Sequence, residues 1–169
     1  MTSTELGPQR NTNKAFGISL RCDYNASACK KYHVYLIMSC MNNKRGVIIK
    51  PAGCRPWPHE ERVADILALA GHKVEFILKT NYKTADILLD GVEFEIKSPE
   101  SFNTNTLEHT LKNATKQSPN IIIDSSRIKK TWDNRILIFL INQARKQKQI
   151  KKLLFITKRG KIIDVSSLI

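Results

Sequence analysis

The chain has 169 residues, 41% of them hydrophobic, which is enough for one domain with a sizeable core and excludes wholesale disorder. Its formal net charge is +13, and such an excess favours a polyanionic partner, with nucleic acid ahead of an anionic membrane surface. A basic surface that is merely solvated is the alternative. The longest apolar run, Tyr32 to Met41, is about half of the ~20 residues that a membrane helix needs, so we expect a protein that works in an aqueous compartment.

The first 57 residues predict an N-terminal extension of unknown role. Residues 1–14 are polar and predict a disordered start. Residues 15–50 contain two apolar runs that fit either a hairpin or a helix. The prolines and glycine that follow predict a junction over residues 51–57.

Four cysteines occur, at positions 22, 29, 40 and 54. None forms a CxxC pair, and no histidine completes a usual zinc spacing. Free buried thiols are therefore expected. Disulfides are the alternative in an exported chain, and a zinc cluster is the least favoured state.

Residues 58–169 predict the main domain. Pro58 suits the first position of a helix, and the acids after it suit a first turn. The periodicity predicts helices over 58–70, 105–117 and 134–148, and strands over 73–78, 85–89, 92–97, 121–123, 153–157 and 162–165. This order predicts an α+β domain around a single mixed sheet.

The most informative stretch is the hairpin predicted over residues 85–97. Asp90-Gly91 is a strong signal for a two-residue turn. In the strand 92–97, apolar and charged residues alternate, so Glu95 and Lys97 share one face. Asp86, on the preceding strand, is placed to lie opposite them.

Two carboxylates and an ammonium group at one point are the components of a site that cleaves phosphodiesters. Asp86 and Glu95 offer hard oxygen ligands to a divalent metal, with Mg²⁺ or Mn²⁺ expected and Zn²⁺ as an alternative. Such a metal activates water and screens charge on the phosphate. Lys97 would position that water or stabilise the developing charge. Glu60, chosen over Glu61, would complete the site from the first turn of its helix.

The same triplet has a plain structural explanation, because an acid–x–Lys pattern on a strand commonly marks a solvated edge. Asp90 is most simply a turn residue, and Glu93 is an alternative ligand on the face of Glu95. The upstream acid, the order of the elements and the basic composition favour the nuclease over this explanation.

Five further residues are candidates for binding substrate. Ser98 follows the charged strand, and Thr106 would contact a phosphate or, more commonly, cap its helix. Gln117 and Ser118 end that helix, and Arg127 is expected to clamp a phosphate.

Other features of the second half fit a nucleic-acid partner. Lysine and arginine dominate residues 127–161, where Asp133 is the only acid, so a backbone-binding track is expected. Trp132 would stack on a base or pack locally. His109 would serve as general base in a metal-free mechanism, although a histidine in its position more often lies on a helix surface.

Taken together, several runs resemble the C-terminal tRNA-nuclease domain of contact-dependent inhibition toxins of the CdiA type. The resemblance covers roughly residues 58–166. Its runs are Pro58-His59-Glu60, 71–77, Ala85-Asp86-Ile87, Asp90-Gly91, 95–99, Thr106-Leu107-Glu108, 117–122 and Asp124.

This resemblance implies a toxin that cleaves tRNA, with a restriction-endonuclease-like αβββαβ core of the PD-(D/E)xK type and a divalent metal. It also implies a cognate immunity protein, and action in the cytoplasm of a target cell after delivery as part of a larger protein. The motif's acidic and lysine positions fall on Glu60, Asp86, Glu95 and Lys97, and Thr106 and Gln117 match the helix that follows. The chain departs from the motif at Ala85, where a proline is common, and at Phe94, where Trp is expected.

The sequence therefore predicts a metal-dependent nuclease that acts on RNA, with tRNA as the expected substrate. A DNA endonuclease with the same core is one alternative. A second is a metal-free ribonuclease of the barnase, EndoU, colicin or RelE type that uses His109 and Lys97. A third is a non-catalytic nucleic-acid-binding protein whose charged hairpin is only surface.

Overall fold

The computed structural model describes residues 45–79 and 84–169. The elements within these ranges are β1 (Ile48–Ile49), α2 (Pro58–Leu69), β2 (Val74–Phe76), β3 (Ile87–Leu89), β4 (Val92–Lys97), α3 (Thr104–Ala114), β5 (Asn120–Asp124), α4 (Asp133–Lys146), β6 (Lys152–Ile156), β7 (Ile162–Asp164) and the 3-10 turn η1 (Ser166–Leu168). The expectations for residues 1–44, including the disordered start and Cys22, Cys29 and Cys40, lie outside the described residues.

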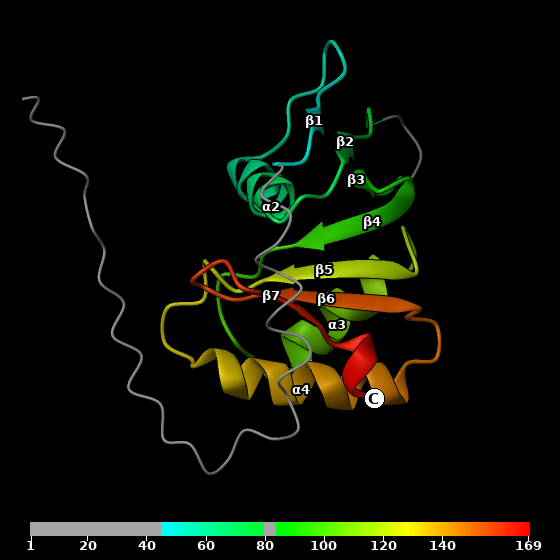
Figure 1. Cartoon of the computed structure of the whole chain (residues 1–169). Helices are drawn as coiled ribbons and strands as arrows, with labels where there is room; N and C mark the ends of the chain where they lie inside the picture. Colours follow the sequence, from blue (N-terminus) through cyan, green and yellow to red (C-terminus); the bar gives the residue numbers. More distant parts are fainter. Residues whose placement is uncertain (1–44, 80–83) are drawn as a thin grey trace, which may run out of the picture. The chain divides into compact units, whose positions relative to one another are not determined.

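In the described part of the chain, seven strands form one sheet in the order β1-β2-β3-β4-β5-β6-β7. The pairs β1–β2, β4–β5 and β5–β6 are parallel, and the other neighbours are antiparallel. Figure 1 shows α2 next to β1 and β2, and α3 and α4 together below β5 and β6. The prediction of an α+β domain with a single mixed sheet is confirmed.

The sheet is covered on both faces, because residues of its central strands alternate between two hydrophobic cores. One core joins α2 to sheet residues that include Ile122 and Leu154. The other joins α3 and α4 to sheet residues that include Ile121 and Leu153. Burial on both faces explains why the centre of β5, Ile121 to Ile123, is an unbroken apolar run.

The hairpin between β3 and β4 turns through two residues, as the sequence predicts. Leu89 pairs with Val92. Asp90 and Gly91 between them have φ values of 50° and 84°, so both adopt the positive φ that a type I′ turn requires. Asp90 is also held from outside, because its Oδ1 accepts a hydrogen bond from the backbone N–H of Lys73 over 2.8 Å.

The register of this hairpin brings Asp86 to the charged strand. Asp86 lies one residue before β3, and its backbone N–H donates to the carbonyl oxygen of Phe94 over 3.1 Å. The strand expected from residue 85 therefore starts at Ile87, but the extended pairing continues far enough to place Asp86 beside Glu95.

The sheet begins earlier than the boundary expected at Pro58. Ile48 and Ile49, in the expected extension, form β1 and pair in parallel with Val74 and Glu75. Two residues carry too little periodicity to predict a strand. Gly46 permits the approach, since a Cβ there would clash with backbone atoms of the neighbouring loop.

The start of α3 differs from the expectation for Thr106. Asn103 is the N-cap, and its side-chain oxygen accepts from the backbone N–H groups of Asn105 and Thr106. Thr106 therefore does not cap the helix, because Asn103 already satisfies the free N–H groups of the first turn. No helix among the described residues combines the length and apolar character needed to cross a bilayer.

Candidate functional site

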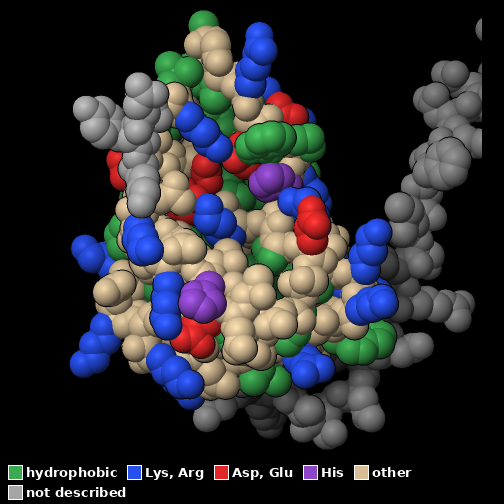
Figure 2. Space-filling model, turned by 180° about the vertical axis from the view of Figure 1, so that it is seen from behind, with side chains coloured by type: hydrophobic (Ala, Val, Ile, Leu, Met, Phe, Trp, Pro, Cys, Tyr) green, Lys and Arg blue, Asp and Glu red, His purple; other side chains and the backbone are tan. Residues whose placement is uncertain are grey.

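A cleft of about 380 Å³ opens where the start of α2 meets the ends of β2 and β3 and the strand β4. Its charged and amide side chains are those of Glu60, Lys79, Asp86, Glu95, Lys97 and Gln117. Figure 2 shows the molecule from behind, with acidic side chains recessed between basic ones in the upper part of this face. The structure thus brings together all four residues predicted as catalytic.

Asp86 is fixed by its own hairpin. The side chain is buried, and its Oδ2 accepts a hydrogen bond of 2.9 Å from the backbone N–H of Ile96. Its Oδ1 lies 3.1 Å from the Nζ of Lys79. Both carboxylate oxygens therefore have a partner, and the carboxylate is oriented before any ligand arrives.

Glu95 is the most unusual group in the cleft, because it is a carboxylate that is only 1% exposed. Its Oε1 accepts a hydrogen bond of 2.6 Å from Nε2 of Gln117 and pairs with Lys97. Its Oε2 is buried and has no hydrogen-bond partner. Burial, which outweighs the hydrogen bond from Lys97 and is assisted by the charge of Asp86, raises the pKa of Glu95 to about 7.

Glu60 has a structural role as well as a place in the cleft. Its Oε2 accepts a hydrogen bond of 2.8 Å from the backbone N–H of Trp57, which closes the first turn of α2. Its Oε1 accepts one of 2.9 Å from Lys79. The glutamate thus stabilises the start of the helix through Oε2, and its Oε1 shares the ammonium group of Lys79 with Asp86.

Lys79 is a cleft residue that the sequence did not suggest. It follows β2, and its ammonium group bridges Glu60 and Asp86. Burial by itself lowers the pKa of Lys79, but hydrogen bonds to the two carboxylates raise it above the ordinary lysine value. Lys79 reaches the cleft because β2 ends there. The sequence pattern of a strand does not show where in the fold the strand ends.

The chemistry of the cleft carboxylates decides whether they suit a divalent metal. No group of three or more His, Cys, Asp or Glu side chains with metal-binding geometry occurs in residues 45–79 and 84–169. The unpaired Oε2 of Glu95 beside the charge of Asp86 is nevertheless the chemistry that a hard cation satisfies. Asp86 and Glu95 fit such an ion as two ligands. Both oxygens of Asp86 already accept from protein donors, as do both oxygens of Glu60, so either residue would bind the ion through a remaining lone pair.

The other predicted residues divide into those at the cleft and those away from it. Ser98 lines the cleft, and its hydroxyl donates to Asp124 over 3.1 Å. Ser118 is buried, and its hydroxyl donates to the carbonyl oxygen of Glu93. Thr106 is exposed and lines no part of the cleft.

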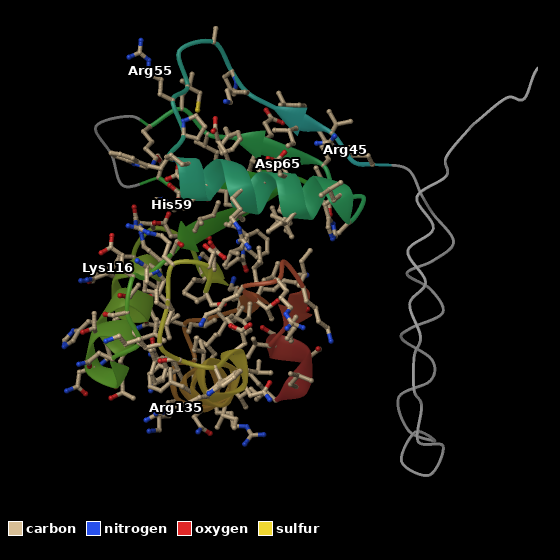
Figure 3. All side chains as sticks on the ribbon, turned by 90° about the vertical axis from the view of Figure 1, so that its left-hand side faces the viewer. Arg45, Arg55, His59, Asp65, Lys116 and Arg135 are labelled. Atoms are coloured by element: carbon tan, nitrogen blue, oxygen red, sulfur yellow. The ribbon has the colours of Figure 1, made fainter. Side chains whose placement is uncertain are left out.

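The side chain of Glu93 is exposed and does not line the cleft, so its predicted ligand position differs from that of Glu95. His109 is also exposed on α3 and outside the cleft. The histidine that does line the cleft is His59, next to Glu60 on α2. Figure 3 shows His59 on the same side of the molecule as Arg55 and Lys116. The sequence offered one signal for His59, because it stands next to Glu60 in the first turn of α2 and both side chains line the cleft.

Two exposed tryptophans mark hollows near basic groups. Trp57 is 63% exposed and borders the cleft. Trp132 is 85% exposed and borders a separate hollow with Lys158, Arg159 and Lys161. Trp132 is thus an exposed residue of the basic region that does not line the carboxylate cleft.

Comparison with known proteins gives one consistent assignment. Residues 83–162 match the family model of the contact-dependent growth inhibition CdiA C-terminal domain. A solved structure, the CdiA-CT/CdiI toxin and immunity complex from Burkholderia pseudomallei, shares this fold with a TM-score of 0.54. It is 17% identical, and the match covers 70% of this chain and 98% of that chain. A search of curated proteins finds no match.

The matched span contains the whole β3–β4 hairpin, with Asp86, Glu95 and Lys97. The predicted resemblance to a CdiA-type C-terminal toxin domain is therefore confirmed over residues 83–162. The chain also shares the fold of the solved toxin from Burkholderia pseudomallei.

Proposed function

We propose that this domain is a toxin that acts as a metal-dependent endonuclease on RNA, with tRNA as its substrate. One observation carries the proposal. Asp86, Glu95 and Lys97 meet in one cleft, and the buried Oε2 of Glu95 has no partner there. A solvated edge does not explain a carboxylate that is buried and half unpaired, because leaving such a group without a partner costs about 1–3 kcal/mol or more.

The residues of the cleft would divide the work as follows. Asp86 and Glu95 would hold a divalent cation, as Mg²⁺ or Mn²⁺ or alternatively Zn²⁺. When bound, the cation would lower the pKa of a water molecule and screen charge on the phosphate. Lys97 would hold the negative charge that builds on the phosphate oxygens. Gln117 would keep Glu95 in the orientation that its hydrogen bond already imposes.

Glu60 and Lys79 lie next to Asp86 and Glu95 in the cleft. Glu60 stays a predicted metal ligand, and Lys79 connects it to Asp86. Ser98 would contact substrate, since it lines the cleft, and Arg127 would clamp a phosphate from the adjoining hollow. Nothing in the position of Thr106 supports the substrate contact predicted for it, and the packing of Ser118 favours a structural role.

A nucleic-acid substrate is favoured by the net charge of +13 and by basic side chains around the cleft. The choice of RNA, and of tRNA in particular, rests on the family resemblance. The same family suggests an immunity protein as partner, because the solved relative is a toxin and immunity complex. We propose that such a partner covers the cleft and that the domain acts in the cytoplasm of a target cell.

The test is cleavage of total tRNA and of plasmid DNA with Mg²⁺, with Mn²⁺ and with EDTA. We expect cleavage of tRNA with metal and none with EDTA. Cleavage of DNA alone would favour the DNA endonuclease, and no cleavage of either would favour a binding protein. Glu93→Gln, on the same strand but outside the cleft, is the matched control for Glu95→Gln.

A metal-free ribonuclease is the second candidate, and the position of His59 favours it. This histidine lines the cleft together with Lys97, whereas His109 does not. Full cleavage of tRNA in EDTA, lost in His59→Ala but retained in His109→Ala, would select this mechanism over the metal-dependent one.

A further inference from the structure

A second hollow of about 630 Å³ adjoins the carboxylate cleft. It is lined by Trp57, Pro58, His59, Arg62, Ser126 and Arg127. Trp57 and His59 border both hollows, so the two are neighbours at the start of α2. A substrate strand bound in the cleft would therefore extend past Trp57 and His59 to reach this second hollow.

One part of the lining of this hollow is the exposed indole ring of Trp57. The backbone N–H of Trp57 is used by Glu60, but its side chain is 63% exposed. An exposed indole beside an acidic cleft in a basic protein offers a flat surface on which a nucleobase can stack.

Two arginines in the lining of the hollow supply guanidinium groups. Arg62 is held in place by Asp124, whose Oδ1 lies 2.6 Å from its Nη1, and by the carbonyl oxygen of Lys158. Its side chain is still 31% exposed, so one side of a fixed guanidinium remains open. Such a pre-oriented group loses little entropy when it meets a phosphate.

Arg127 is the second guanidinium, and it is held more weakly. It pairs with Glu100, whose side chain is 75% exposed. An exposed ion pair of this kind is worth about 0–1 kcal/mol, so a phosphate can replace Glu100 at little cost.

The buried carboxylate of Asp124 ties both hollows together. It accepts hydrogen bonds from Ser98, which lines the cleft, and from Ser126, which lines the second hollow. One buried carboxylate therefore links a side chain of the cleft to a residue of the second hollow.

We infer that the second hollow binds one nucleotide of the RNA substrate beside the phosphate that is cut. The base stacks on Trp57, and the adjoining phosphate lies between Arg62 and Arg127. This inference rests on the proposal that the domain acts on RNA, and it adds the subsite that positions the strand.

The chain itself provides the reporter, because Trp57 and Trp132 are its two tryptophans. In a Glu95→Gln background and in EDTA, Trp132→Phe leaves Trp57 as the sole tryptophan, and Trp57→Phe leaves Trp132. A short single-stranded RNA with 2′-O-methyl sugars, which resists cleavage, is titrated into each. We expect the fluorescence of Trp57 to be quenched and that of Trp132 to change little.

Affinity gives a second measurement. Trp57→Ala is expected to weaken binding of the same RNA by about tenfold or more, as loss of one stacked base does. Trp132→Ala is its control. Arg127→Gln is expected to weaken binding several-fold and to lower the salt slope by about one. Arg45→Gln, which removes an exposed arginine paired with Asp65 outside the hollow, is the control for Arg127→Gln.

Unquenched Trp57, or equal affinity of Trp57→Ala and the parent, would overturn the subsite. So would quenching confined to Trp132. If tRNA is cut but Trp57 does not respond, the subsite alone is wrong. If Trp57 responds but the parent protein with Glu95 restored cuts no RNA, the nuclease proposal fails and the binding subsite stands.

Discussion

The Nζ of Lys79 lies 3.1 Å from Oδ1 of Asp86, so an ammonium group already occupies the cation-attracting side of this carboxylate. The same Nζ lies 2.9 Å from Glu60. Lys79 thus neutralises part of the acidic cluster, and a metal that binds Asp86 must share it with this charge.

The first prediction follows from this competition. Lys79→Met should tighten Mn²⁺ binding about fivefold or more, because a unit charge about 4 Å away is worth at least about 1 kcal/mol. Isothermal titration calorimetry of the protein without RNA measures this directly. Lys50→Met removes a lysine that pairs with exposed Glu61 and should leave the affinity unchanged. Equal or weaker binding in Lys79→Met would show that this lysine does not compete with the metal.

The second prediction concerns the two acids of the hairpin. Asp86→Asn and Glu95→Gln keep the shape of each side chain but remove its charge, so each should lower tRNA cleavage by about a hundredfold or more. Far-UV circular dichroism should show an intact fold in both. Glu93→Gln should retain activity because Glu93 lies outside the cleft. Near-normal cleavage by both cleft variants would mean that these acids play no part in catalysis.

The third prediction is a pH dependence of stability without metal. The pKa of Glu95 is raised from 4.5 to about 7, so the folded protein binds this proton more tightly than the unfolded chain does. Between these values the folded state holds more protons, and the free energy of unfolding therefore falls as pH rises from about 4.5 to 7. The loss should be about 2–3 kcal/mol, measured by urea unfolding.

Glu95→Gln tests the source of that dependence. The amide cannot ionise, so the fall in stability over this pH range should largely disappear in the variant. A fall of the same size in Glu95→Gln and in the parent would assign the dependence to another group.

The fourth prediction concerns the buried pair beneath the two hollows. Asp124→Asn removes the charge that partners Arg62 and should lower the free energy of unfolding by about 2–4 kcal/mol. Part of the full cost is avoided because Arg62 is partly exposed and can turn to water. Asp65→Asn is the control, since its pair with Arg45 spans 3.6 Å on the exposed surface and should cost less than about 1 kcal/mol. Equal stabilities of the two variants would contradict this account.

Much of the hairpin was predictable because its information is local. Asp90-Gly91 specifies a two-residue turn, and such a turn fixes which residues of β3 and β4 face each other. The alternation in β4 then assigns Glu95 and Lys97 to one face. The same reasoning placed α2, β5 and the hairpin of β6 and β7 close to their observed bounds.

The sequence by itself therefore determined the core of the candidate site, Asp86 with Glu95 and Lys97, because a short turn and a period of two connect them. Only the tertiary structure decided what surrounds it. Lys79 and His59 reach the cleft from separate elements, and Arg62 meets Asp124 across 62 residues of chain. Such contacts depend on how helices pack on the finished sheet, and no local pattern encodes that packing. The unpaired oxygen of Glu95, which now carries the proposed function, is likewise a consequence of burial and became visible only in the folded domain.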